Sequence, residues 1–318
     1  MIRVVAAAVL AALALSAPAS AEPRLTVGKP RLRAALRCAG DLHGAAKRPI
    51  MLVTGTGSSG DEFRLFEKGA TDAHGAPVCW VNFSHYTTAD VQVSVQYLVY
   101  GLRVMARRAG RRVAVFGISQ GGLLPRIALT YWPSLRRKVS DVVAVAGTQH
   151  GTNIFKASNC RPAGCPPAVW QQVRGSRFLH ALNRKGRDET PGRRTAWTTV
   201  RSRTDEVVQP QTGRHPTSAL RGASNILIQS VCPGRRVSHI GSAVDSVTWA
   251  VLLDALHYKG PGRASRLPAG VCGHPYGPGL DEAQTSTLVA AGAGLAASHV
   301  ASQLRTPYEP RVRAWARR

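Results

Sequence analysis

The sequence is poor in acidic and in aromatic residues. Asp and Glu number 17 against 42 Lys and Arg, which gives a formal net charge of +25. Phe, Trp and Tyr make up 6% of the chain, and no stretch interleaves base-stacking rings with basic residues, so we expect no specific nucleic-acid partner. We predict a solvated basic surface with at most a loose attraction to anionic lipid or cell-envelope surfaces.

Long apolar runs are also missing. The run nearest the amino terminus, residues 4–15, follows Met1-Ile2-Arg3 and precedes Ala19-Ser20-Ala21. A membrane-spanning helix needs about 20 apolar residues, whereas a basic start, a short apolar core and an A-x-A site are typical of a secretory signal peptide. We therefore interpret residues 1–21 as a signal peptide cleaved after Ala21, and we predict a secreted protein.

The remaining chain is long enough to bury one large core. We expect residues 22–318 to form a single α/β domain with a basic C-terminal tail, since residues 311–318 hold the densest basic cluster. No repeat or low-complexity linker divides the chain. Nothing in the sequence argues against a monomer.

Cysteine is sparse, at six residues, and a secreted chain uses such cysteines as disulfides. The segment Cys160-Arg-Pro-Ala-Gly-Cys165 predicts a local bridge, because its Pro-Ala-Gly turn brings the two thiols together. A zinc site there would need two further ligands, and only His150 is close in sequence. We therefore expect no metal and no other cofactor.

Apolar, β-branched runs alternate with helical patterns along the chain. This alternation predicts an α/β fold with a mostly parallel sheet and helices on both faces. Residues 174–194 and 259–279 are loop-rich and are interpreted as insertions. Strands are predicted at 49–54, 78–82, 113–118, 139–146, 198–202 and 226–231, and helices at 88–109, 123–131, 246–255 and 282–303.

The strongest functional signal is Gly117-Ile-Ser119-Gln-Gly121, which follows an apolar strand and precedes an apolar run. Gly-x-Ser-x-Gly alone is a weak pattern in a Gly-rich chain, but strand, sharp turn and helix are the context of a nucleophile elbow. The two glycines allow strand and helix to approach closely around the turn. Pro125 is tolerable only in the first turn of the helix that follows. Ser119 is therefore the predicted nucleophile.

A serine nucleophile needs a histidine base and an acid, in the chain order Ser, acid, His for this elbow. Asp205 follows the strand predicted at 198–202, and His239 lies on the loop after the strand predicted at 226–231. Both would lie at the carboxyl edge of the sheet, where Ser119 also lies. We predict that Asp205 and His239 complete the triad.

Several other residues are candidates for these two roles. Glu206 is next to Asp205 but points elsewhere in an extended chain, and Asp188 has no strand before it. His150 follows a strand but precedes any plausible acid. The remaining candidates are loop or helix histidines: His215, His257 and His274.

An oxyanion hole needs two hydrogen-bond donors. The N–H of Gln120 is one, and the loop Gly55-Thr56-Gly57 after the first predicted strand offers the N–H and hydroxyl of Thr56 as the other. A plain turn or a phosphate-binding loop is the alternative for this segment. It lacks the Gly-Lys-Ser/Thr ending of a P-loop.

Several stretches resemble the lipases related to Candida antarctica lipase B, in the α/β-hydrolase superfamily. The resemblance runs in order from about Cys38 to about Pro310. Its most specific blocks are the Thr-Asp-Glu and Trp-Gln-Gln stretches. The matching segments are Thr54–Gly60, Pro77–Trp80, Ser119–Gly122, Trp132–Ser134, Val169–Gln172, Thr204–Gln211 and Ser238–Ser242.

The resemblance implies a secreted triacylglycerol lipase and carboxylesterase. It assigns the triad to Ser119, Asp205 and His239 and the oxyanion hole to Thr56 and Gln120, in agreement with the reading of the residues. It also implies the disulfides Cys38–Cys79 and Cys232–Cys272, which leaves Cys160 and Cys165 to pair with each other.

The sequence departs from the family in four places. Gly117 and Ile118 replace a Thr and a Trp before the serine, and that Trp floors the alcohol pocket, so Ile118 predicts a roomier pocket with weaker enantiomer preference. Thr148 stands where the family has an Asp. No Cys follows Cys272, so a C-terminal disulfide is missing. Residues 154–169 replace a short mobile helix, which leaves lid behaviour open.

We therefore expect a serine lipase or carboxylesterase that acts on acylglycerol-type esters, with an ester or lipid as its partner. A polyester or cutin-type esterase is the alternative enzyme, because a roomier alcohol pocket fits it equally well. A non-catalytic, basic envelope-binding protein is the remaining alternative. It predicts that a triad residue is absent, and all three are present.

Overall fold

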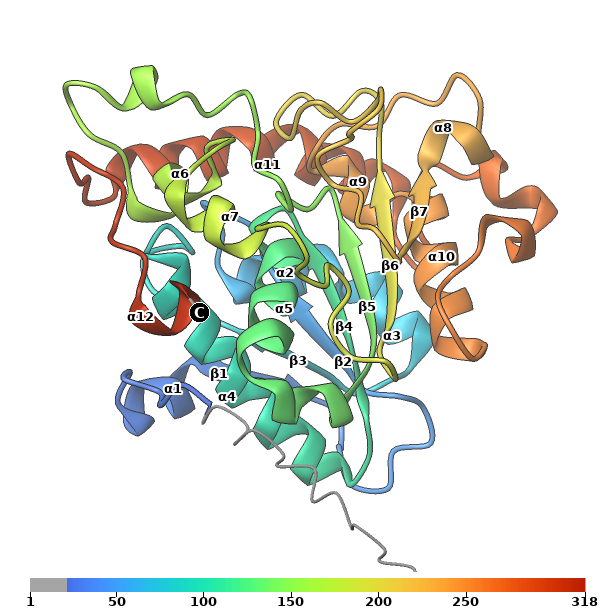
Figure 1. Ribbon diagram of the computed structural model, residues 1–318. Coiled ribbons are helices and arrows are strands. Elements are labelled where there is room, and N and C mark those ends of the chain that lie inside the picture. The colour runs from blue at the N-terminus through green and yellow to red at the C-terminus, as the bar shows by residue number, and fades with distance from the viewer. Residues whose placement is uncertain (1–21, 318) are drawn as a thin grey trace, which may run out of the picture.

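A seven-stranded sheet forms the centre of the molecule. The computed structural model describes residues 22–317, so the predicted signal peptide and its cleavage site lie outside the described residues. The strand order is β1-β3-β2-β4-β5-β6-β7, and every neighbouring pair is parallel except β1 with β3. The strands are β1 (Leu36–Ala39), β2 (Ile50–Val53), β3 (Val78–Val81), β4 (Val113–Ile118), β5 (Val139–Val145), β6 (Ala196–Arg201) and β7 (Ser224–Leu227) (Figure 1).

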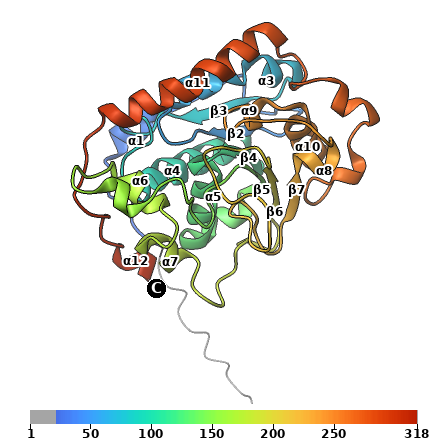
Figure 2. The same ribbon diagram turned by 90° about the horizontal axis from the view of Figure 1, so that it is seen from above.

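Helices cover both faces of this sheet, as the sequence predicts. Figure 2 shows α4 and α5 on one side and α3 and α10 on the other, each over its own hydrophobic core. The helices are α1 (Lys29–Ala35), α2 (Gly60–Phe66), α3 (Lys68–His74), α4 (Val91–Ala109), α5 (Gln120–Tyr131), α6 (Pro167–Gln172), α7 (Arg177–Leu182), α8 (Ile228–Val231), α9 (Gly241–Val244), α10 (Ser246–His257), α11 (Glu282–Ser302) and α12 (Ala314–Arg317), with 3-10 turns such as η1 (Pro133–Arg137). The fold class is confirmed.

The central elements follow from their local sequence. Every residue of β4 and β5 is buried, as expected of parallel strands covered on both faces. The helix α4 begins after Asp90, whose side chain accepts a hydrogen bond from the Gln92 N–H, and it ends at Gly110 in the left-handed conformation. The sequence pattern predicts a start at Thr88, which is three residues too early.

Two sequence predictions are wrong in detail. The strand predicted at 226–231 ends at Leu227, and Ile228–Val231 is the helix α8, because a short apolar run does not distinguish a strand from a buried helical turn. Pro125 lies in the second turn of α5, since the helix already begins at Gln120, directly after the elbow. Its missing N–H leaves one helical hydrogen bond unmade near the start of α5.

The basic C-terminal segment is not a free tail. It returns across the molecule after α11 and ends in α12, where Trp315 packs against Tyr131 and Trp132 with ring centroids 4.8 and 5.1 Å apart. Ala316 is fully buried, and its carbonyl accepts a hydrogen bond of 3.0 Å from the Tyr131 hydroxyl. The segment therefore belongs to the core on the α4 and α5 side.

Three disulfides close the fold. They join Cys38 to Cys79 between β1 and β3, Cys160 to Cys165 in the segment before α6, and Cys232 to Cys272. These are the pairs that the sequence and the resemblance implied. Among residues 22–317, no helix is long and apolar enough to cross a membrane.

A buried carboxyl group makes the stability of this fold depend on pH. Glu67, between α2 and α3, is fully buried and accepts a hydrogen bond of 2.9 Å from the Trp249 indole. Its other carboxyl oxygen has no partner among the described residues. Burial raises the pKa of Glu67 well above its usual value, against the lowering effects of Trp249 and Arg64. The folded protein therefore holds this group neutral where the unfolded chain ionises it.

We expect Glu67→Gln to remove that dependence. The stabilising contribution of a raised carboxyl pKa is complete below the unfolded pKa of about 4.3 and is lost as pH rises toward the folded pKa, at up to about 1.4 kcal/mol per pH unit. The variant should therefore gain stability over wild type from pH 5 to pH 7 in urea unfolding. Glu282→Gln, at an exposed position, is the control. Parallel stability curves for wild type and Glu67→Gln would contradict the prediction.

Candidate active site

Ser119 occupies a strained turn between β4 and α5. Its φ of 58° and ψ of −124° are unusual for a residue other than glycine. A Cβ on Gly117 would lie 2.2 Å from the Gly121 carbonyl oxygen, and one on Gly121 would lie 2.0 Å from the Val53 carbonyl oxygen. Only glycine therefore fits on either side of the serine, and the turn has the geometry of a nucleophile elbow.

The loop after β2 lies against this turn. A Cβ on Gly55 would lie 2.9 Å from the Ser119 Cβ and 3.4 Å from its Oγ. The structure thus places the Gly55-Thr56-Gly57 segment beside Ser119, as expected for a loop that contributes to an oxyanion hole. Ile118, the last residue of β4, is 6% exposed and directly precedes the serine.

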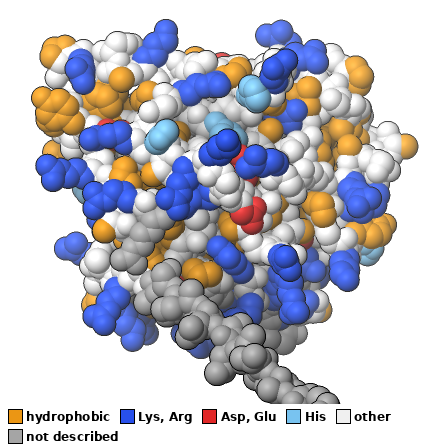
Figure 3. All heavy atoms as spheres, in the orientation of Figure 1, with side chains coloured by type: hydrophobic (Ala, Val, Ile, Leu, Met, Phe, Trp, Pro, Cys, Tyr) orange, Lys and Arg blue, Asp and Glu red, His pale blue; other side chains and the backbone are white. Residues whose placement is uncertain are grey.

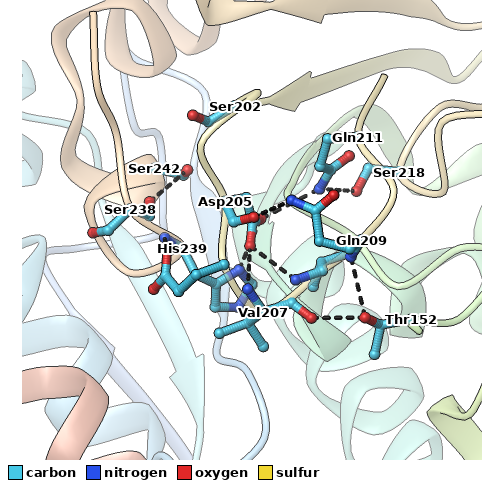
Figure 4. Close-up of polar contacts among 12 residues, drawn as sticks. Thr152, Ser202, Asp205, Val207, Gln209, Gln211, Ser218, Ser238, His239 and Ser242 are labelled. Carbon is cyan, nitrogen blue, oxygen red and sulfur yellow. Dashed lines mark hydrogen bonds and ion pairs between the residues drawn. The ribbon is translucent and has the colours of Figure 1, made fainter. Parts of the chain in front are cut away.

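Asp205 and His239 meet at the same edge of the sheet. The His239 Nδ1 lies 3.0 Å from the Asp205 Oδ2, and the two residues are 5% and 1% exposed. The Asp205 Oδ1 accepts hydrogen bonds of 2.8 Å from the Val207 and Val208 N–H groups (Figure 4). The Gln211 side chain donates to Oδ2 at 3.3 Å. These donors fix the carboxylate so that Oδ2 faces the imidazole.

This arrangement also fixes the histidine tautomer. A carboxylate accepts hydrogen bonds, so His239 Nδ1 carries the proton that it donates to Asp205. The other ring nitrogen, Nε2, is then free to accept a proton. The Glu206 carboxylate accepts the His239 backbone N–H at 3.0 Å, so Glu206 holds the chain of this loop and not the imidazole ring.

The other candidate acids and bases lie elsewhere. His150 lies 3.8 Å from Glu189 and contacts the Thr217 carbonyl, and the Asp188 Oδ1 accepts the Thr190 N–H in its own loop. His257 packs against Tyr258 with ring centroids 4.7 Å apart. Among the described residues, no group of three or more His, Cys, Asp or Glu could hold a metal ion.

A partly buried network of hydrogen bonds holds the side chains of the predicted oxyanion residues. The Thr56 hydroxyl donates to the Gln120 Oε1 at 2.6 Å. The Gln172 Nε2 donates to the Thr56 Oγ1 at 2.8 Å and to the Gln120 Oε1 at 3.1 Å. Thr148 completes the chain by donating to the Gln172 Oε1 at 2.9 Å. Gln172 was not singled out from the sequence, although the conspicuous Trp-Gln-Gln block contains it.

The helix α11 packs against the loop Gly55-Thr56-Gly57, near the carboxyl ends of the strands (Figure 1). A Cβ on Gly57 would lie 2.5 Å from the Ala296 carbonyl oxygen, so only glycine allows this approach. The His299 Nδ1 lies 2.9 Å from the Gly57 carbonyl oxygen, and its ring stacks on Tyr86 with centroids 3.8 Å apart. No pattern in the sequence pointed to His299.

No family model matches this chain. Lipase B of Pseudozyma antarctica is 31% identical over 246 residues, which covers 75% of this chain and 70% of that protein. The crystal structure of Aspergillus fumigatus lipase B superposes on this chain with a TM-score of 0.84 at 30% sequence identity. The superposition covers 99% of this chain and 77% of the Aspergillus fumigatus chain.

A more distant structure supports the fold alone. The Bacillus licheniformis lipase BlEst2 in its propeptide form has a TM-score of 0.56 at 15% identity, over 72% of this chain and 54% of that one. The elbow, the Asp205–His239 pair and the network around Thr56 therefore belong to a chain that is similar to lipase B in both sequence and structure.

Proposed function

The chain belongs to the lipase B family of α/β-hydrolases and is a carboxylic ester hydrolase, and from this we propose that it is a secreted enzyme that cleaves acylglycerol-type esters through an acyl-enzyme on Ser119. The observation that carries the proposal is the 3.0 Å contact between His239 Nδ1 and Asp205, at the sheet edge that also presents Ser119 on its strained turn. A positioned imidazole is what a serine hydroxyl needs to become a nucleophile.

The mechanism follows from these roles. His239 Nε2 takes the Ser119 hydroxyl proton while Oγ attacks the ester carbonyl carbon. The tetrahedral oxyanion accepts hydrogen bonds from the Gln120 N–H, the Thr56 N–H and the Thr56 hydroxyl. The imidazolium then protonates the leaving alcohol, and the intermediate collapses to the acyl-enzyme. Water repeats the sequence with His239 as base and releases the acid and free serine.

A series of esters tests the proposal. We expect the protein to hydrolyse p-nitrophenyl esters from acetate to palmitate, and its chain-length profile separates an esterase from a lipase. A p-nitrophenyl phosphonate should inactivate it by phosphonylating the Ser119 oxygen with release of p-nitrophenol, which peptide mass spectrometry locates. No ester hydrolysis by the folded, oxidised protein, or a label on another residue, would overturn the proposal.

A roomy alcohol pocket is compatible with two substrate classes, acylglycerols and polyesters. Ile118 beside the nucleophile is smaller than the Trp that the family carries there, so we propose a pocket that accepts bulky alcohols with weak enantiomer preference. Polyester films compared with tributyrin and olive-oil emulsions test the polyester alternative. Faster hydrolysis of the films than of either emulsion would favour it.

Residues 22–318 are proposed to be the mature, secreted single domain. The three disulfides support an oxidising compartment. The mass of the protein recovered from culture medium tests cleavage after Ala21, and a mass that retains residues 1–21 would contradict it.

The oxyanion network predicts a specific role for the Thr56 hydroxyl. In the free enzyme this hydroxyl donates to Gln120 Oε1, so it must turn toward the oxyanion when the ester reacts. We expect Thr56→Val to lower kcat by about a hundred- to a thousandfold with little change in KM, because the donor acts only in the transition state. Thr56→Ser keeps the hydroxyl and should retain most activity. Equal loss in both variants would assign Thr56 a packing role.

A further inference from the structure

One face of α11 packs against two loops at the carboxyl edge of the sheet. Residues three, four and seven positions apart align along a helix, and on α11 they form one row. The row consists of Gly292, Ala296, His299 and Val300. A Cβ on Gly292 would lie 3.3 Å from the Ile240 Cγ2, so α11 lies against the residue that follows His239. Ala296 approaches Gly57 in the same way, so the helix also contacts the loop Gly55-Thr56-Gly57, which we call the oxyanion loop.

Two side chains of α11 form hydrogen bonds with other segments of the described chain. The Ser286 Oγ lies 2.9 Å from the Tyr276 hydroxyl, near the start of the helix. The His299 Nδ1 lies 2.9 Å from the Gly57 carbonyl oxygen, near its end. Residues 283–304 contain no Asp, Glu, Lys or Arg, whereas Figure 3 shows Lys and Arg side chains spread widely over the face that it presents. His299 is therefore the hydrogen-bonding link between this uncharged helix and the oxyanion loop.

The surroundings of His299 fix the direction of its N–H. A carbonyl oxygen only accepts hydrogen bonds, so Nδ1 carries the proton that it donates to Gly57. The Tyr86 ring stacks on the imidazole with centroids 3.8 Å apart and holds the plane of the ring. The Glu62 Oε1 lies 3.8 Å from the same nitrogen, which is too far for a hydrogen bond. The other oxygen of Glu62 accepts the Ser59 N–H at 2.7 Å, so this carboxylate caps α2 and leaves Gly57 as the acceptor for His299.

Gly57 is held on both of its backbone groups, while the residue before it keeps a free donor. The Gly57 N–H donates to the Tyr86 carbonyl at 2.8 Å, and the Gly57 carbonyl accepts the bond from His299. Gly57 is buried, so both groups need such partners. The Thr56 N–H has no acceptor among the described residues. The contacts of Gly57 therefore fix the oxyanion loop and leave the Thr56 N–H available to a substrate oxygen.

We propose that His299 is a positioning residue for the oxyanion hole, which acts by holding the Gly57 carbonyl and thereby the Thr56 N–H. An oxyanion donor is effective because it is already in place when the negative charge develops. Without the donor of His299, the buried Gly57 carbonyl would lose its partner, and the oxyanion loop would have to shift to satisfy it. The proposal rests on the proposed ester hydrolysis at Ser119 and adds α11 to the elements that shape its transition state.

The test compares replacements of His299 with a control on the same helix. His299→Leu removes the donor and keeps an apolar side chain against Tyr86. His299→Asn keeps a donor, because the asparagine Nδ2 is as many bonds from Cα as the histidine Nδ1. Ser286→Ala is the control, since it removes the other hydrogen bond of α11, the 2.9 Å contact with Tyr276, without touching the oxyanion loop. Hydrolysis of p-nitrophenyl butyrate gives kcat and KM for each protein.

We expect His299→Leu to lower kcat by about tenfold to a hundredfold, with KM within about twofold, because a small displacement of a donor costs rate and not ground-state binding. His299→Asn should recover most of the activity, and Ser286→Ala should equal wild type. An alkylboronic acid provides a second measurement. The Ser119 oxygen adds to its boron, the proton passes to His239, and the anionic tetrahedral adduct places an oxygen in the oxyanion hole. Its inhibition constant should rise in His299→Leu by about the factor that kcat falls.

Thermal unfolding checks that each variant is folded, and His299→Ala, which should show the same loss, takes the place of His299→Leu if the leucine variant does not fold. Equal losses in His299→Leu, His299→Asn and Ser286→Ala would overturn the proposal in favour of a packing role for α11. A raised KM with unchanged kcat, or an unchanged inhibition constant for the boronic acid, would also overturn it. An active wild type with an equally active His299→Leu variant would refute this proposal alone, whereas an inactive wild type would refute the proposed function as well.

Discussion

Replacing Ser119 with Ala is expected to lower kcat for ester hydrolysis by about a millionfold, to the residual level that the oxyanion donors and substrate binding alone provide. The variant keeps a Cβ at this strained turn, so the close contacts with Gly55 and the loop after β2 remain. Loss of activity would then reflect the missing hydroxyl and not a rearranged elbow. The measurement is kcat on p-nitrophenyl butyrate, with wild type and variant purified side by side.

Two further measurements would attribute the loss of activity to the Ser119 hydroxyl. The variant should bind a non-hydrolysable ester analogue with an affinity close to that of wild type, because Thr56, Gln120 and Gln172 are unchanged. It should also show no burst of p-nitrophenol, since no acyl-enzyme forms. Activity in the variant comparable to wild type would mean that another residue, or another protein in the preparation, performs the hydrolysis.

The sequence predicts those features that depend on short stretches. The elbow was recognised because Gly117, Ser119 and Gly121 stand in a fixed spacing between an apolar strand and a helix. Asp205 and His239 are predictable because each follows a predicted strand, and carboxyl ends of parallel strands meet at one edge of a sheet. The structure brings these two side chains to 3.0 Å even though 34 positions separate them. Only the first two residues of the strand predicted at 226–231 belong to β7, yet the loop that carries His239 still follows this segment.

Several contacts between distant segments carry no signal in the sequence. Gln172 acts on Thr56 from α6, across 116 positions of sequence, and a glutamine carries no local signal for such a role. His299 reaches Gly57 across 242 positions, from a helix whose composition indicates only apolar packing. The sequence predicts a basic tail at the C-terminus because Arg311, Arg313 and Arg317 dominate the segment. Its two packing residues, Trp315 and Ala316, decide its actual position against Tyr131.

Asp205→Asn is expected to lower kcat by about ten-thousandfold with little change in KM, because it should reverse the tautomer of His239. The Val207 and Val208 N–H groups, each 2.8 Å from Oδ1, require an acceptor at that position. The asparagine carbonyl oxygen must therefore face them, which turns its NH2 group toward His239. The imidazole Nδ1 then accepts a hydrogen bond, Nε2 carries the proton, and the ring can no longer take the proton of Ser119.

Glu206→Gln is the matched control for that variant, since it removes the neighbouring carboxylate charge while an amide oxygen can still accept the His239 N–H that Glu206 accepts at 3.0 Å. We expect less than a tenfold change in kcat from this control. Both variants are compared with wild type on the same ester at neutral pH, with thermal unfolding as the check on folding. A larger loss from Glu206→Gln than from Asp205→Asn would transfer the orienting role to Glu206. Asp205 contacts the His239 ring, whereas the adjacent Glu206 contacts only the His239 backbone N–H, so this pair of variants tests whether the contact with the ring makes His239 a base.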